Sequence, residues 1–189
     1  MKILITGIAG FLGFHLAKKL IEQGHEISGI DDINDYYDID LKKLRLSTLG
    51  LESSKFYELD INNISSIDDT FDLVINFAAQ AGVRVPLERK AYYKHSNIEG
   101  FKRVVNFCKD RSIKKMIYAS SSSVYDDSSL LPFSETNTDL KPKSEYGISK
   151  LFNEQYLDKL NFEINCVGLR FFSVYGPFGR PDMAYFSFT

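Results

Sequence analysis

The stretch Thr6-Gly7-Ile8-Ala9-Gly10-Phe11-Leu12-Gly13 follows a short apolar run at residues 2–6 and opens a helical pattern at 11–23. Glycines in such a place allow a tight turn, let the backbone approach a ligand, and leave a helix N-terminus pointing at negative charge. Strand, glycine-rich turn and helix in this order are the context of a dinucleotide-binding site. The spacing is Gly-x-x-Gly-x-x-Gly rather than Gly-x-Gly-x-x-Gly, so the motif by itself fits an ordinary tight turn equally well.

Apolar runs that suit strands alternate with helical patterns along nearly the whole chain. Gly24 is placed to end the first helix. We expect strands at residues 2–6, 26–30, 55–59, 72–77, 115–119 and 164–169, and helices at 11–23, 40–48, 96–110 and 145–159. This alternation predicts an α/β fold of the Rossmann type, a doubly wound parallel sheet in three layers with helices on both faces.

The chain has 189 residues, of which 44% are hydrophobic and 25% charged, and its formal net charge is -2. This size suits one well-buried domain. The near balance of charge offers no broad basic field for nucleic acid and no polybasic patch for a membrane. No apolar run approaches the ~20 residues of a membrane span. We therefore expect a cytoplasmic protein that binds neither nucleic acid nor a membrane.

The cysteines and histidines give no sign of a metal site. Cys108 and Cys166 lie in apolar segments and form no Cys-x-x-Cys motif, and the three histidines are scattered along the chain. Two buried free thiols in a reducing compartment are the expected state of the cysteines.

Carboxylates follow two of the predicted strands. Asp31 ends the second strand, where a carboxylate can accept hydrogen bonds from the adenosine ribose of a dinucleotide. Asp31 and Asp32 would also repel a 2′-phosphate, and residues 31–35 contain no Lys or Arg to hold one. This pattern favours NAD over NADP. Asp60, after the third strand, is placed either to meet the adenine edge or to cap a turn.

Tyr146 and Lys150 stand four residues apart in the last predicted helix, so their side chains share one helix face. A tyrosine ionises near pH ~10 in water and is a poor base at neutral pH. A cation fixed nearby favours the phenolate and lowers that pKa. Beside a bound nicotinamide, such a pair is a device for moving a proton and a hydride.

These motifs resemble those of the extended short-chain dehydrogenase/reductase family, within it the NAD-dependent epimerases and dehydratases of nucleotide sugars. The resemblance covers essentially the whole chain. It rests on the glycine-rich turn, on Asn76-Phe77-Ala78-Ala79-Gln80-Ala81-Gly82-Val83-Arg84, on Ser120-Ser121-Ser122-Ser123-Val124-Tyr125 and on Tyr146-Gly147-Ile148-Ser149-Lys150. The closing segment 169–183 and Asn34-Asp35-Tyr36-Tyr37-Asp38 look most like those of UDP-glucuronate 4-epimerases.

The resemblance implies an NAD-dependent enzyme that inverts C4′ of a UDP-sugar, UDP-glucuronate above all, through a transient 4-keto sugar. Tyr146 would take the proton of the 4′-hydroxyl while hydride passes to NAD. Lys150 would hold the nicotinamide ribose and favour the phenolate. Ser121 matches the family's catalytic Ser or Thr and would hydrogen-bond the reacting oxygen.

The resemblance also implies two sets of binding residues. The cofactor-binding positions are Gly7, Ala9, Gly10, Phe11, Leu12, Gly13, Asp31, Asp32, Asp60, Ile61, Ala78, Ala79, Gln80, Asn97, Tyr146, Lys150 and Tyr175. The substrate-binding positions are Arg84, Ser122, Ser123, Ser173 and Arg180. An arginine fork suits a carboxylate bidentately, and an ordinary surface arginine is the competing interpretation of Arg180.

Two departures from the family pattern bear on function. Asp126 stands where the family usually has glycine after Val-Tyr. Family members also continue well beyond this length, and the further residues carry most of the nucleotide-sugar site. We therefore expect residues 1–170 to form an NAD-binding Rossmann domain and residues 171–189 to begin a substrate-binding domain that is largely absent. This chain alone is not expected to turn over substrate.

Two other functions stay open. A nucleotide-sugar 4,6-dehydratase would carry Asp-Glu after its catalytic residue, whereas Ser122-Ser123 has no acid at either place. A non-catalytic NAD-binding module is favoured by the missing portion and opposed by the intact Ser, Tyr and Lys set. The family also commonly forms homodimers through a four-helix bundle. Phe101, Val105, Leu151 and Tyr156 would contribute to such a surface unless they pack in the core.

Overall fold

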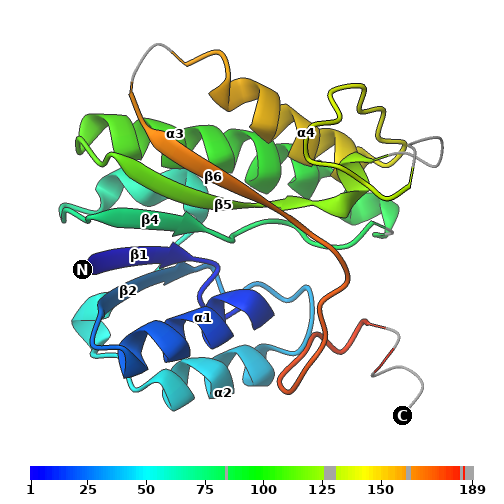
Figure 1. The fold of residues 1–189 in the computed structure, drawn as a ribbon. Coiled ribbons are helices and arrows are strands. Elements are labelled where there is room, and N and C mark those ends of the chain that lie inside the picture. The colour runs from blue at the N-terminus through cyan, green and yellow to red at the C-terminus, as the bar shows by residue number, and fades with distance from the viewer. Residues whose placement is uncertain (84, 126–130, 161–162, 184, 186–189) are drawn as a thin grey trace.

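The described residues form one sheet of six parallel strands at the centre of the molecule (Figure 1). The computed structural model describes residues 1–83, 85–125, 131–160, 163–183 and 185. In chain order the strands are β1 (Lys2–Thr6), β2 (Glu26–Asp31), β3 (Phe56–Glu58), β4 (Leu73–Asn76), β5 (Lys115–Ser121) and β6 (Asn165–Phe171). They lie in the order β3-β2-β1-β4-β5-β6, and each neighbouring pair is parallel. The predicted doubly wound parallel sheet is confirmed.

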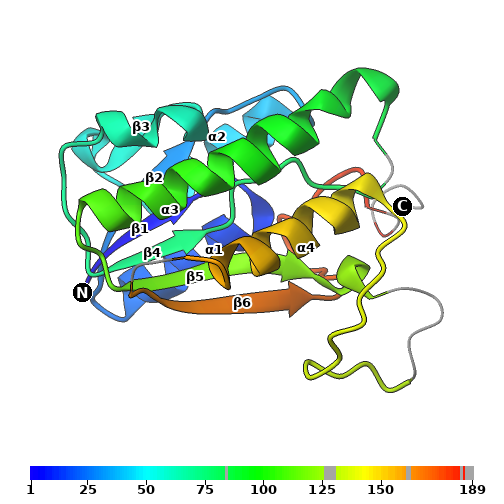
Figure 2. The ribbon, with the colours of Figure 1, turned by 90° about the horizontal axis from the view of Figure 1, so that it is seen from above.

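Helices cover both faces of the sheet and complete the three layers. α1 (Phe11–Glu22) and α2 (Ile39–Leu49) lie on one face, and α3 (Phe101–Asp110) and α4 (Glu145–Leu157) lie on the other (Figure 1). The view from above shows α3 and α4 crossing the same side of the sheet (Figure 2). Short helices fill the connections: η1 (Ser53–Lys55), η2 (Ile61–Ser66), η3 (Leu87–Arg89), η4 (Tyr93–Gly100) and η5 (Ser122–Val124), of which η4 is a π-helix.

The observed elements follow the predicted ones with local differences. α1 ends at the predicted glycine: Gly24 has a left-handed φ of 81°, and its amide donates to the carbonyl of Ile21. β5 and β6 continue past their predicted ends at residues 119 and 169, because the two strands pair with each other as far as Ser121 and Phe171. The helix predicted from residue 96 begins earlier, as η4. The spacing of apolar residues in the sequence does not distinguish the π-helix η4 from the α-helix α3 that follows it.

Two apolar clusters, one on each face of the sheet, hold the layers together. On the α3 face, Phe101, Val104 and Val105 pack with residues of β4 and β5. On the α1 face, Phe14 and Ala17 pack with the isoleucines of β1. Phe101 and Val105 are buried in this chain's own core. Of the two interpretations left open for these residues, core packing is the one observed.

Both cysteines are free thiols on the α3 side of the sheet. Cys108 is buried and Cys166 is partly buried. Burial raises the pKa of Cys108 to about 12, so this thiol is protonated at neutral pH and acts as a small apolar side chain.

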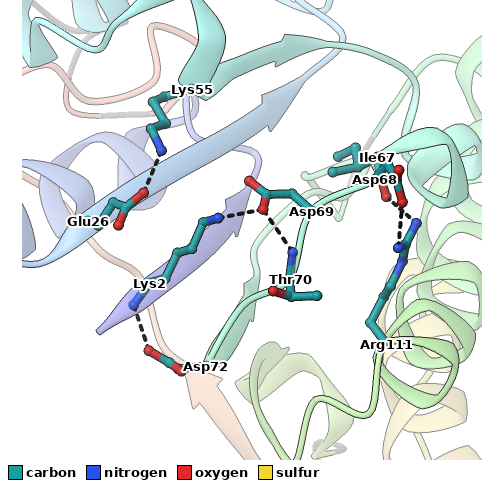
Figure 3. Close-up of polar contacts among 9 residues, drawn as sticks. All are labelled: Lys2, Glu26, Lys55, Ile67, Asp68, Asp69, Thr70, Asp72 and Arg111. Atoms are coloured by element: carbon teal, nitrogen blue, oxygen red, sulfur yellow. Dashed lines mark hydrogen bonds and ion pairs between the residues drawn. The ribbon is translucent and has the colours of Figure 1, made fainter.

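Ion pairs fasten the amino-terminal ends of the strands, at the opposite end of the sheet from the glycine turn. Figure 3 shows Lys2 at the start of β1: its ammonium pairs with Asp69, and its amide donates to Asp72 at 2.8 Å. Lys55 pairs with Glu26 at the start of β2. Exposed pairs of this kind contribute little to stability, so their part is to align neighbouring strands.

Phe101→Ala is expected to lower the free energy of unfolding by about 3–5 kcal/mol, because it leaves a cavity between α3 and the sheet. Chemical denaturation followed by circular dichroism measures the loss. Leu44→Ala is the control, since Leu44 on α2 is exposed and its truncation should change stability by only about 0.5 kcal/mol. Equal effects of the two substitutions would contradict the placement of Phe101 in the core.

Candidate active site

A cavity of about 380 Å³ lies at the carboxyl ends of the central strands. The strand order changes direction between β1 and β4, and ligands of open α/β sheets bind in the crevice at such a switch point. Its lining includes Gly7, Gly10, Phe11, Leu12, Gly13, Asp31, Asp32, Ile61, Ala78, Ala79, Gln80, Ser121, Ser122, Ser123, Tyr146, Lys150, Ser173 and Arg180. Most of the residues predicted for the site therefore meet in one place.

The glycine turn presses the start of α1 against the ends of β1 and β4. Gly7 has a left-handed φ of 70°, and a Cβ there would stand 2.8 Å from the amide nitrogen of Ala78. A Cβ on Gly13 would stand 2.1 Å from the carbonyl oxygen of Gly7. α1 starts at Gly10 without a side-chain cap, so its first amide groups are left for an anionic ligand.

A carboxylate and an ammonium lie together at the β2 end of the cavity. Asp31 is buried and accepts hydrogen bonds from the amides of Ala9 and Ile33 at 3.0 and 3.1 Å. Burial raises the pKa of Asp31, and the Lys42 charge opposes this rise. Lys42 is buried too, lines the cavity and donates to the Asn34 carbonyl at 2.6 Å. Sequence reasoning missed Lys42, because only the packing of α2 against the sheet brings its side chain close to Asp31.

Buried polar groups hold the loop after β4 on both sides. The Thr6 hydroxyl accepts the Ala78 amide at 3.1 Å. Asn97, in the π-helix η4, accepts the Gln80 amide at 2.8 Å and donates to the hydroxyl of Ser149 on α4 at 3.0 Å. Asn97 is buried and does not line the cavity. It positions this loop against α4 and has no direct access to a ligand there.

The ends of β5 and α4 bring a phenol, a hydroxyl and an ammonium together. Ser144 caps the first turn of α4. The side chains of Tyr146 and Lys150 reach the cavity from this helix. The Ser121 hydroxyl lies near enough to the Tyr146 phenol to lower its pKa. The Lys150 ammonium lies 5.7 Å from the centroid of the Tyr146 ring and donates to the Ala119 carbonyl at 2.9 Å.

Burial dominates the protonation of this group. It raises the pKa of Tyr146, while the Ser121 hydrogen bond and the Arg180 charge oppose the rise. Burial also lowers the pKa of Lys150 to about 8. The prediction that Lys150 lowers the pKa of the phenol is wrong for this structure. The ammonium is turned to a backbone carbonyl, and the net shift of the Tyr146 pKa is upward.

Some predicted cofactor residues lie outside the cavity lining. Asp60 caps η2 by accepting a backbone amide of that turn at 2.8 Å, and it pairs with His95. Of the two roles predicted for Asp60, the structure shows the turn cap. The neighbouring Ile61, which is also predicted to bind the cofactor, lines the cavity. Tyr175 is exposed and packs on Tyr185, with 5.3 Å between ring centroids. The glycine-turn residue Ala9 is also absent from the lining and reaches the site only through its bond to Asp31.

Four of the predicted substrate residues line the cavity: Ser122, Ser123, Ser173 and Arg180. The fifth, Arg84, lies outside the described residues, as does Asp126. The Arg180 guanidinium is paired with Asp182 of its own chain, with 2.9 Å between Nε and Oδ1.

Arg45 ties three distant segments together beside the glycine turn. Its side chain is fully buried and donates to the carbonyls of Ala9 and Phe178 at 2.8 and 2.6 Å. It also donates to the Tyr37 hydroxyl at 2.6 Å. The segment after β6 is thereby held against the start of α1. Sequence reasoning missed Arg45, since nothing in a helical pattern separates a buried arginine from a solvated one.

In the described part of the chain, no group of three or more His, Cys, Asp or Glu side chains is arranged to hold a metal ion. None of the helices in the same ranges combines the length and the apolar character that crossing a membrane requires.

Comparison with known proteins places these features in a family. The model of the NAD dependent epimerase/dehydratase family matches residues 3–188. The chain belongs to this family. Protein CapI of Staphylococcus aureus is 46% identical to it over 196 aligned residues, which take in 100% of this chain and 59% of CapI. UDP-glucuronate 4-epimerase 2 of Arabidopsis thaliana is 41% identical over 100% of this chain and 45% of that protein.

A solved structure resembles this member of the epimerase/dehydratase family closely. It is UDP-glucuronic acid 4-epimerase from Bacillus cereus, in complex with UDP-glucuronic acid and NAD, with a TM-score of 0.84 and 36% sequence identity. The match covers 98% of this chain and 61% of that one. The chain thus spans between 45% and 61% of the length of these three relatives. The predicted family is confirmed.

Lys150→Met is expected to raise the free energy of unfolding at pH 7 by on the order of 1–3 kcal/mol, because it replaces a buried ammonium with an apolar side chain. The pKa of Lys150 is about 8 in the fold against an ordinary 10.5. Below pH 8 Lys150 is protonated in both the folded and the unfolded chain, and the folded chain bears the full free-energy cost of burying the ammonium. Between these values the unfolded chain binds more protons, so the wild type gains stability as pH rises.

Urea denaturation at pH 7 and pH 9.5 measures both effects, and the advantage of Lys150→Met should shrink at the higher pH. Lys18→Met, on the exposed side of α1, is the control and should show no such trend. A Lys150→Met variant that is less stable than the wild type by the same amount at both pH values would contradict a buried ammonium.

Proposed function

We propose that this protein is an NAD-dependent nucleotide-sugar epimerase that inverts C4′ of a UDP-sugar, with UDP-glucuronate as substrate. The observation that carries the proposal is that Tyr146, Ser121 and Lys150 share a cavity with the glycine turn and Asp31. Similarity to the epimerases of Arabidopsis thaliana and Bacillus cereus supports the choice of reaction and substrate.

The residues around the glycine turn fit NAD. Gly7 and Gly13 let the start of α1 close on the strands, so backbone amide groups rather than side chains would meet a pyrophosphate. Asp31 would accept the hydroxyls of the adenosine ribose, and Lys150 would hold the nicotinamide ribose. When bound, NAD supplies the acceptor and donor of a hydride.

The charges at the β2 end of the cavity favour NAD over NADP. Asp31, Asp32 and Lys42 line this end, two carboxylates against one ammonium, for a net charge of -1. Lys42 is already engaged with the carbonyl and the side chain of Asn34. A 2′-phosphate would therefore meet net repulsion.

Tyr146 is assigned the proton transfer. In its ionised form, as a phenolate, it would take the proton of the sugar 4′-hydroxyl and become a neutral phenol, and it would return that proton to the same oxygen after the 4-keto sugar has turned over. Ser121 would hydrogen-bond the reacting oxygen. The Ser121 hydrogen bond and the Arg180 charge both lower the pKa of the phenol against the effect of burial, so both assist the loss of its proton.

Arg180 is assigned the recognition of a uronate carboxylate. Its guanidinium lines the cavity and acts electrostatically on Tyr146, and a planar arginine fork matches a carboxylate. We accordingly assign residues 1–170 to the NAD-binding domain and residues 171–189 to the beginning of the substrate-binding portion, to which Ser173 would also belong.

The alternatives differ in what favours them. Dehydration is not proposed, because Ser122-Ser123 offers no acid. A non-catalytic NAD-binding module is the second candidate, because the glycine turn and Asp31 would hold NAD whether or not turnover follows. A cytoplasmic location and a homodimer through α3 and α4 complete the proposal, with the half-buried Leu151 and Tyr156 available to the interface.

Isothermal titration calorimetry is expected to give a Kd for NAD about tenfold or more below that for NADP, because a 2′-phosphate meets Asp31 and Asp32. Asp32→Asn removes one of these charges and should narrow the difference. Asp35→Asn is the control, because Asp35 pairs with Arg89 and does not line the cavity. Equal affinities in the wild type, or tighter binding of NADP, would rule out the assignment.

In a chain as long as these relatives, Tyr146→Phe is expected to slow C4′ inversion of UDP-glucuronate by about 100-fold or more, because the proton has no acceptor, while the Kd for NAD changes by no more than about twofold. NMR spectra of the reaction mixture measure turnover, with UDP-glucose and UDP-N-acetylglucosamine as parallel substrates. Tyr92→Phe, at an exposed tyrosine, is the control.

Two outcomes of this assay would change the proposal. Turnover retained by Tyr146→Phe would remove Tyr146 from the role of base. Binding of NAD by the wild type of that longer chain, without turnover of any of the three sugars, would favour the non-catalytic module.

A further inference from the structure

The guanidinium of Arg180 is already paired with a carboxylate of its own chain. Nε donates to Oδ1 of Asp182 at 2.9 Å, and Nη2 donates to Oδ2 at 2.5 Å. This two-point contact is the geometry with which an arginine binds the carboxylate of a ligand. Asp182 therefore occupies the guanidinium group that the carboxylate of a uronate would need.

The two partners differ in how firmly the fold holds them. The Arg180 side chain is 18% exposed, lines the cavity and lies over the ring of Tyr36, with 5.6 Å from Cζ to the ring centroid. The Asp182 side chain is 38% exposed and does not line the cavity. Beyond the ion pair, Asp182 accepts one hydrogen bond, from the Tyr36 hydroxyl at 3.2 Å. Asp182 thus lies nearer to solvent than Arg180, which packs on the aromatic ring.

The position of Arg180 links this pair to the proton-transfer group. Its charge lowers the pKa of the Tyr146 phenol, and both residues line the same cavity. A carboxylate bound by Arg180 would therefore stand in the chamber that holds Tyr146. A sugar that carries a carboxylate would be oriented by the same contact.

We propose that Asp182 is a specificity-determining residue, an internal carboxylate that holds Arg180 in the absence of ligand and is exchanged for the carboxylate of an anionic sugar nucleotide. This inference rests on the proposed function. Exchange of one carboxylate for another leaves no buried charge unpaired before or after binding. A neutral hexose cannot make the exchange, because its hydroxymethyl group cannot replace a charged partner, and it leaves the Arg180 and Asp182 pair intact.

Calorimetric titration of the NAD-loaded protein, in a chain as long as these relatives, with UDP-glucuronate and with UDP-glucose tests the inference. Asp182→Asn keeps the size of the side chain and removes the competing charge. The Kd for UDP-glucuronate is expected to fall roughly fivefold, the strength of a partly exposed ion pair. The Kd for UDP-glucose should stay within about twofold, since a neutral sugar does not compete for Arg180.

The chain offers a matched control. Asp139→Asn removes the same charge from a pair with Lys141 that has the same spacing in sequence, and the Asp139 side chain is 77% exposed and outside the cavity lining. It should leave both affinities unchanged. In an Arg180→Met background the effect of Asp182→Asn should disappear, because Asp182 acts through Arg180.

The outcomes separate this inference from the proposed function. If the wild type binds UDP-glucuronate and Asp182→Asn binds it equally or more weakly, the role of Asp182 is overturned and the proposed substrate stands. An equal gain for both sugars also overturns that role, since it reports a looser cavity. If the wild type binds UDP-glucose and not UDP-glucuronate, the proposed substrate itself is overturned.

Discussion

The close approach of two backbones at the glycine turn is the constraint on which the rest of the site depends. The carbonyl of Gly7 and the first turn of α1 come so near that a Cβ on Gly13 has no room, and a Cβ on Gly7 would also collide with the backbone after β4. This approach places the uncapped start of α1 over the switch point of the sheet. It also brings the Ala9 amide to Asp31. A side chain at either glycine would separate these parts.

Several charges in and beside the cavity are held in ion pairs, whereas the buried Lys150 ammonium has a backbone carbonyl as its partner. One such pair, with both side chains largely buried, joins Arg170 of β6 to Glu154 of α4 at 3.0 and 2.8 Å, and the Ser120 hydroxyl bonds the same carboxylate. Glu154 lies one helical turn beyond Lys150. The pair therefore fastens α4 to the end of β5 and sets Tyr146 against Ser121.

Much of the fold was predictable, because it follows from short-range patterns. The bounds of β1 and the end of α1 at Gly24 were read from an apolar run and a single glycine. The site was predictable where one motif carries the function, as at the glycine turn and the Tyr146 and Lys150 pair. It was not predictable where the partner lies far along the chain. Arg45 and Phe178 are joined by a hydrogen bond of 2.6 Å across 133 positions, and no local pattern announces it.

The sequence by itself determined the parallel α/β fold, the family and the residue types at the site, since glycines, hydrophobic periods and i, i+4 spacings act within a few turns of chain. Only the tertiary structure decided how those residues are charged and engaged. Burial shifts the pKa values of both Tyr146 and Lys150. Asp60 caps a helical turn, and Arg180 is paired with a carboxylate of its own chain. Burial and long-range contact arise only when distant segments pack, and these two quantities control the electrostatics of a site.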